Sequence, residues 1–159
     1  NAVKRLAAAG AGLITVHASA GEEALRRAVA AADGASILAI TILTSFAEPA
    51  VQRIYRRAIP DAVTEFALLA AKVGVPGIVC SPQELSLLGE RGELGHLLKV
   101  TPGVRPSWFD RAGDDQSRVL TPREAVEAGA THLVIGRPIT GAADPQAAAE
   151  RINEELAGC

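Results

Sequence analysis

The sequence predicts an α/β fold built on a parallel sheet. Short apolar runs rich in β-prone residues alternate with longer stretches of helical periodicity along all 159 residues. No hairpin-type turn joins two neighbouring apolar runs, so the strands are expected to be connected by helical crossovers. The predicted order is one opening helix and then five strand–helix units, in a single domain over residues 1–159.

Two architectures fit this order: an open doubly wound sheet and part of an eightfold barrel. A dinucleotide-binding open sheet usually carries G-x-G-x-x-G after its first strand, and the sequence has no such motif. A complete barrel needs eight strands and about 250 residues. The sequence therefore predicts a partial barrel, with about the last five strand–helix units of a (β/α)8 TIM-type barrel.

The first half of the sequence begins with an alanine-rich helix that Gly10 and Gly12 end. The long helical region after the second strand contains Pro60, which is expected to divide it into two pieces. The expected elements are a helix at 1–9, a strand at 13–16, a helix at 22–32, a strand at 37–43, and helical pieces at 49–58 and 61–73.

The second half carries three helix N-cap signals. Ser81 precedes Pro82, Thr121 and Glu124 have the spacing of a capping box, and Asp144 precedes Pro145. The connection at 101–120 is rich in Gly, Pro, Asp and Ser, as in loops that bind or cover a ligand. The expected elements are strands at 77–80, 97–100 and 132–135, and helices at 83–88, 121–129 and 144–156.

Composition narrows the possible partners and the compartment. The net charge of −2 and the pI near 5.9 give no basic surface for nucleic acid, and no apolar stretch approaches the roughly 20 residues of a membrane helix. Cys80 and Cys159 lie far apart and fit no metal-ligand spacing. We therefore expect a cytoplasmic protein with neither metal, nucleic acid nor membrane as a partner.

Polar and cationic residues follow the predicted strands. In a parallel barrel the ligand binds at the carboxyl ends of the strands, and the last two strand ends commonly hold phosphate. Gly136 with Arg137, and Gly103 with Arg105, have the make-up of such a phosphate site, because glycine admits backbone N–H groups and arginine supplies paired donors. Turns and surface ion pairs are the alternative reading of these residues.

Five segments also resemble a known family. They are LAITILTS at 38–45, VCSP at 79–82, VTPGVRP at 100–106, DDQ at 114–116 followed by LTP at 120–122, and VIGRPIT at 134–140. In this order and spacing they resemble orotidine 5'-phosphate decarboxylase. The resemblance implies an eightfold barrel, usually a homodimer, that converts orotidine 5'-phosphate to uridine 5'-phosphate and carbon dioxide in pyrimidine biosynthesis, without metal or organic cofactor.

The same resemblance assigns substrate-binding roles to residues of this chain. Thr44 and Ser45 would contact the pyrimidine end of the nucleotide, and Pro102 would line the base pocket. Gln116 would reach towards phosphate and base from the loop that it brackets with Arg105. The last two assignments are Gly136 and Arg137, which would hold the phosphate.

One family feature is absent from the sequence. The family carries Asp-x-Lys-x-x-Asp on its third strand, and its lysine protonates the carbon that loses the carboxylate. The lysines here, Lys4, Lys72 and Lys99, have no such surroundings. We therefore expect no catalytic residue in this chain, no activity of the chain alone, and the N-terminal strands of the barrel to be absent from the sequence.

Two other functions fit the same residues. One is a sugar-phosphate decarboxylase or aldolase of the same barrel group, usually with magnesium, and the other is a catalytically inactive half-barrel that binds phosphate. The Thr-Ser pair at 44–45 and the Asp-Asp-Gln at 114–116 favour a pyrimidine nucleotide over a sugar phosphate.

Overall fold

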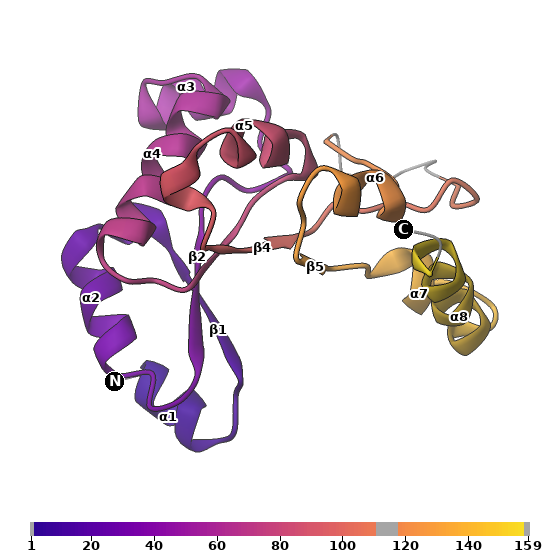
Figure 1. Cartoon of the computed structure of the whole chain (residues 1–159), viewed down its shortest axis with the longest axis horizontal. Coiled ribbons are helices and arrows are strands. Elements are labelled where there is room, and N and C mark those ends of the chain that lie inside the picture. Colours follow the sequence, from indigo (N-terminus) through magenta and orange to yellow (C-terminus); the bar gives the residue numbers. More distant parts are fainter. Residues whose placement is uncertain (1, 111–117, 158–159) are drawn as a thin grey trace.

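The computed structural model describes residues 2–110 and 118–157, which form one parallel sheet with helices around it (Figure 1). The strands are β1 (Leu13–His17), β2 (Ser36–Ile40), β3 (Gly77–Val79), β4 (Leu98–Thr101) and β5 (His132–Leu133). The α-helices are α1 (Ala2–Ala8), α2 (Glu22–Ala30), α3 (Glu48–Tyr55), α4 (Ile59–Lys72), α5 (Leu85–Gly89), α6 (Pro122–Glu127), α7 (Arg137–Thr140) and α8 (Pro145–Leu156). Short 3-10 turns are η1 (Ala18–Ala20), η2 (Pro82–Glu84) and η3 (Gly92–Leu94).

The five strands are parallel and adjacent in chain order, β1-β2-β3-β4-β5. This confirms the predicted parallel sheet and rules out a doubly wound order among the described strands, because no strand is inserted out of sequence. In Figure 1 the sheet bends, from β1 and β2, which run steeply in the view, to β4 and β5, which lie almost flat. Curvature of this kind is what a barrel wall requires.

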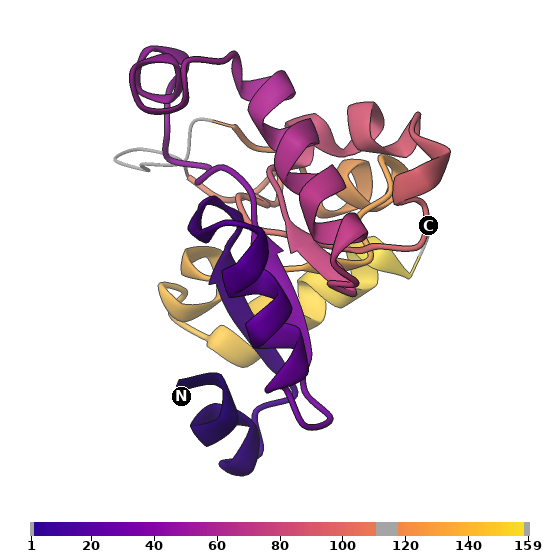
Figure 2. The ribbon, with the colours of Figure 1, turned by 90° about the vertical axis from the view of Figure 1, so that its left-hand side faces the viewer.

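Register defines the two faces of the sheet, because paired residues of neighbouring parallel strands lie on the same face. Val16, Ala39, Ile78 and Lys99 form one row; Ala39 and Ile78 belong to the hydrophobic core under the helices, and Val16 packs against it. Figure 2 shows α2 lying across β1 and β2 on this face. The helix-covered face therefore holds the core.

The opposite face carries Gly77 at its centre. A Cβ atom on Gly77 would lie 2.7 Å from Leu38 Cδ2 and 2.8 Å from Leu98 Cβ, both in the neighbouring strands. Only glycine fits where the side chains of β2 and β4 close over β3.

Several element boundaries differ from those predicted. Pro60 does not separate the two helical pieces, because it is the second residue of α4, a position that tolerates a missing N–H. α3 instead ends at Tyr55, and its C-cap residue, Arg56, has a left-handed φ of 58°. The strand expected at 37–43 ends at Ile40. The short helix α7 was not predicted, because Gly136 and Pro138 read as breaks.

Candidate functional site

The residues expected to bind a ligand follow the carboxyl ends of the strands. Since the strands are parallel and in chain order, these ends lie along one edge of the sheet. Thr44 and Ser45 follow β2, Pro102 and Arg105 follow β4, and Gly136 with Arg137 follows β5. The fold therefore places six of the seven expected residues on this edge, and the seventh, Gln116, lies outside the described residues.

The segment after β2 forms a tight turn. Phe46 N–H donates to Leu43 C=O over 2.9 Å, so the turn encloses Thr44 and Ser45. Thr44 is buried and Ser45 is exposed. Two residues before the turn, Thr41 fixes the chain to the sheet, because its hydroxyl donates to Val79 C=O over 2.8 Å. The two hydroxyl residues thus sit on an anchored segment rather than on a long loop.

The connection after β4 is pinned where its two arms meet. Val104 and Leu120 form a parallel bridge, and Arg105 N–H donates to Leu120 C=O over 2.9 Å. Gly103 turns the chain into this bridge with a φ of 79°, a conformation that favours glycine. Residues 104–105 and residue 120 are therefore neighbours although the chain between them is long.

Arg105 is enclosed by its own connection. It is only 6% exposed, its Nη1 donates to Val104 C=O over 3.0 Å, and its guanidinium carbon lies 5.6 Å from the centre of the Phe109 ring. Arg105 also lines a hollow of about 200 Å³, together with Thr121 and Glu124. In this arrangement its guanidinium faces the base of the connection.

Gly136 and Arg137 begin the short helix α7 and are exposed. The Gly136 carbonyl accepts hydrogen bonds from the N–H groups of Ile139 and Thr140, at 2.8 and 3.0 Å. Gly136 presents no side chain, and a Cβ there would meet nothing within 4 Å. The Arg137 side chain is thus on an open part of the edge, where a solute can reach it.

A buried ion pair lies behind this edge. Arg118 Nη1 is 2.5 Å from Glu84 Oε1, and Arg118 Nη2 donates to Leu43 C=O over 3.0 Å. Glu84 is 5% exposed and Arg118 8%. Sequence reasoning missed this pair, since 34 residues separate its members and no motif links them.

Burial dominates the ionisation of two groups near these loops. It raises the pKa of the Glu84 carboxyl, and the charge and hydrogen bonds of Arg118 act in the opposite direction. Burial also raises the pKa of the Cys80 thiol to about 12. Cys80 is therefore a protonated core residue at neutral pH and not a nucleophile, as its apolar strand predicted.

Lys99 occupies the middle of β4 and is buried on the helix-covered face, in register with Ile78. Within residues 2–110 and 118–157, no three His, Cys, Asp or Glu side chains are grouped so as to hold a metal ion. Among the same residues, no helix is both long and apolar enough to cross a membrane.

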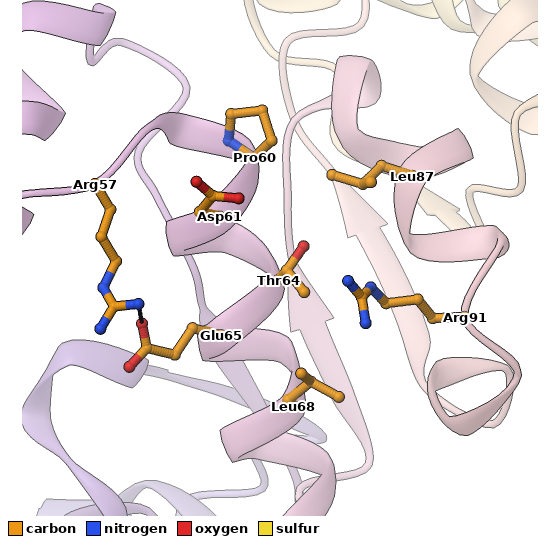
Figure 3. Close-up of a pocket in the computed structure, with 8 residues that line it drawn as sticks. All are labelled: Arg57, Pro60, Asp61, Thr64, Glu65, Leu68, Leu87 and Arg91. Carbon is orange, nitrogen blue, oxygen red and sulfur yellow. Dashed lines mark ion pairs between the residues drawn. The ribbon is translucent and has the colours of Figure 1, made fainter.

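A second hollow, of about 380 Å³, lies between α4 and α5 (Figure 3). Arg91 projects into it towards Thr64, and Arg57 forms an ion pair of 2.9 Å with Glu65 at its margin. None of the residues expected from the sequence to bind a ligand lines this hollow. It lies between helices and is separate from the candidate site.

Comparison with protein families gives one match over nearly the whole chain. The model described as "Orotidine 5'-phosphate decarboxylase / HUMPS family" matches residues 1–152. Proteins named orotidine 5'-phosphate decarboxylase are among the similar sequences. That of Halorhodospira halophila is 47% identical over 93% of this chain and 64% of its own length. That of Thermobifida fusca is 45% identical over 98% of this chain and 66% of its own length.

Solved structures give the same result. Orotidine 5'-phosphate decarboxylase from Lactobacillus acidophilus superposes with a TM-score of 0.80 and 35% identity, covering 98% of this chain and 67% of that one. The enzyme from Sulfolobus solfataricus, at 20% identity and a TM-score of 0.69, shares the fold. The chain thus spans about two thirds of the length of its relatives, and its five strand–helix units correspond to part of their TIM barrel.

Proposed function

The chain belongs to the orotidine 5'-phosphate decarboxylase / HUMPS family, and from that premise we propose that it forms part of an orotidine 5'-phosphate decarboxylase. This enzyme converts orotidine 5'-phosphate to uridine 5'-phosphate and carbon dioxide in pyrimidine biosynthesis. The observation that carries the proposal is the sheet edge, where hydroxyl residues after β2 and an exposed Gly-Arg pair after β5 follow parallel strands of one curved sheet. A nucleotide has a base at one end and a phosphate at the other. Two strands, β3 and β4, separate the hydroxyl residues after β2 from the Gly-Arg pair after β5, so the two groups suit the two ends of a nucleotide.

The proposed contacts divide between the two ends of the ligand. Thr44, Ser45 and Pro102 serve the pyrimidine. Gly136 lets the backbone approach the phosphate closely, and the Arg137 guanidinium pairs with two phosphate oxygens. Arg105 and Gln116 bracket the connection after β4, from which Gln116 is proposed to contact the phosphate and the base.

The chemical step needs groups that this sequence does not contain. Asp-x-Lys-x-x-Asp is absent from the sequence, and Lys99 is buried on the helix-covered face of the sheet. We therefore propose that these 159 residues bind the nucleotide but do not decarboxylate it by themselves. The complete enzyme that we propose carries the catalytic motif, is a cytoplasmic homodimer, and needs no metal or organic cofactor.

Arg137→Ala in the complete enzyme tests the proposal. Hydrogen bonds to charged groups are worth about 1.5 to 3 kcal/mol each, so kcat/KM for orotidine 5'-phosphate should fall about 10- to 1000-fold. Turnover of the nucleoside orotidine should change little, because it has no phosphate to bind. Arg27→Ala, at an exposed arginine of α2, is the matched control and should change neither reaction.

Equal losses on orotidine and its phosphate would remove Arg137 from the phosphate site. A complete enzyme that released no carbon dioxide from orotidine 5'-phosphate, but acted on a ketose phosphate, would contradict the proposed substrate. Release of carbon dioxide by the 159-residue chain alone would contradict the proposal that it binds the nucleotide without decarboxylating it.

A further inference from the structure

We infer that Arg118 and Glu84 form a positioning unit, which fixes the turn that carries Thr44 and Ser45 against the base of the connection after β4. Neither residue is assigned a ligand contact. This role deepens the proposed function and rests on it, because it concerns the segment proposed to contact the pyrimidine.

The unit joins three strand-end segments through one guanidinium. Glu84 ends η2, the turn after β3, and Arg118 lies on the returning arm of the connection after β4. Arg118 Nη1 binds Glu84 Oε1 at 2.5 Å, and Nη2 donates to Leu43 C=O at 3.0 Å, in the segment after β2. The planar fork of an arginine fixes the separation between its two acceptors, which the single ammonium of a lysine cannot do.

The environment makes this arrangement specific. Both residues are buried, with 5% of Glu84 and 8% of Arg118 exposed. Glu84 Oε2 and Arg118 Nε have no hydrogen-bond partner within the described part of the chain. A buried ion pair with unsatisfied atoms is costly to form and is poor evidence for stability, but it strongly disfavours arrangements that separate the charges. We therefore assign it a role in geometry.

Leu43 transmits that geometry to the proposed site. Its carbonyl accepts from Arg118 Nη2 and from Phe46 N–H, so the guanidinium holds the first residue of the turn around Thr44 and Ser45. The distances that fix the unit all lie among the segments after β2, β3 and β4, whereas Gly136 and Arg137 follow β5. Loss of the unit should therefore displace the pyrimidine end of the site and leave Gly136 and Arg137 in place.

The test is Arg118→Lys in the complete enzyme, with Arg91→Lys as the matched control, because Arg91 pairs with Glu93 at 3.7 Å on the surface. Affinities for uridine 5'-phosphate and for ribose 5-phosphate are measured by calorimetry well below the unfolding midpoint. Arg118→Lys should weaken uridine 5'-phosphate about 10-fold and ribose 5-phosphate less than about 2-fold. Equal weakening of both ligands, or unchanged affinity for uridine 5'-phosphate, would overturn the role.

Hydrogen exchange gives a readout that needs no ligand. The amide of Phe46 should exchange faster in Arg118→Lys, while the amide of Thr41, which donates to Val79 C=O over 3.1 Å, should keep its protection. Glu84→Gln preserves the shape of the unit and removes one charge, so it serves if Arg118→Lys does not fold, and it should also raise exchange at Phe46. Unchanged exchange at Phe46 in the folded variants would contradict the inference, whereas a wild-type enzyme that bound neither ligand would contradict the proposed function alone.

Discussion

Helices α4 and α8 have similar lengths but are held in place by different means. α4 has 14 residues and buries six of them, including Val63 and Ala67, yet its N-cap residue, Ala58, makes no side-chain hydrogen bond. α8 has 12 residues and buries only Ala148 and Ile152, and its N-cap, Asp144, accepts from Ala147 N–H at 3.0 Å. Tertiary packing positions α4, and a local cap defines the start of α8.

The two ends of the proposed site differ in the same way, one by its packing against the core and the other by its local helix caps. The segment with Thr44 lies among elements of the main hydrophobic core, whose buried members run from Ile14 to Leu97. Gly136 and Arg137 lie between α6 and α8, both of which start with a side-chain cap. Parts of a protein with few buried contacts open at lower free energy. The proposed phosphate end therefore belongs to the more easily opened region.

Val63→Ala in α4 should have the largest effect on stability. The side chain is fully buried, so losing two methyl groups should lower the free energy of unfolding by about 2 kcal/mol, including the cavity left behind. Leu156→Ala, at a half-buried position at the end of α8, removes more atoms but should cost less than about 1 kcal/mol. Urea denaturation of the complete protein measures the change in the free energy of unfolding for both variants. A larger loss for Leu156→Ala than for Val63→Ala would contradict the difference between α4 and α8.

The fold could be predicted because the signals for it are local. Apolar runs and helical periodicity predicted five parallel strands in order. The caps at Thr121 and Asp144 were confirmed, whereas Ser81 caps the 3-10 turn η2 that precedes α5 rather than an α-helix. The end of α3 could not be predicted, since Arg56 carries no residue-type signal for the left-handed backbone that it adopts. The length of β5 also depends on neighbouring strands, and only His132 and Leu133 of the predicted run pair with β4.

The site was predictable only as far as its chain order. Thr44, Pro102, Arg105 and Arg137 lie after strands as expected, because strand ends follow from periodicity. The enclosure of Arg105 beside Phe109, and the pairing of Arg118 with Glu84, depend on how distant segments meet and have no periodic signal. The binding roles of Arg105 and Gln116 remain predictions, and so does the positioning role of Arg118 and Glu84.

Asp144→Ala should have an intermediate effect, confined at first to α8. Removing an N-cap side chain costs about 1 kcal/mol, because the N–H of Ala147 loses its acceptor. Asp144→Asn is the matched control and should retain most of the stability, since asparagine caps as well as aspartate. Hydrogen exchange of α8 amides should accelerate more than that of α4 amides; equal acceleration would mean that the two helices open as one unit.

The smallest effect should appear as a pH dependence in α6, the other capped helix. Thr121 N–H and its hydroxyl donate to Glu124 Oε2 at 2.8 and 2.7 Å, and these bonds, the backbone one foremost, lower the pKa of Glu124 below its ordinary value of 4.5. A carboxylate whose pKa is lowered on folding contributes stability above its unfolded pKa and loses it as the pH falls through the folded value. A double-mutant cycle of Thr121→Ala and Glu124→Gln isolates the hydroxyl part of this interaction, because residue 121 keeps its backbone N–H in every variant. Its coupling free energy should favour the pair at pH 7 and shrink below about pH 4.5. The carboxylate is exposed, so solvent screens the interaction and the coupling should be smaller than the cost of Asp144→Ala. A coupling that stayed constant or grew in acid would show that the neutral acid caps α6 as well as the carboxylate does.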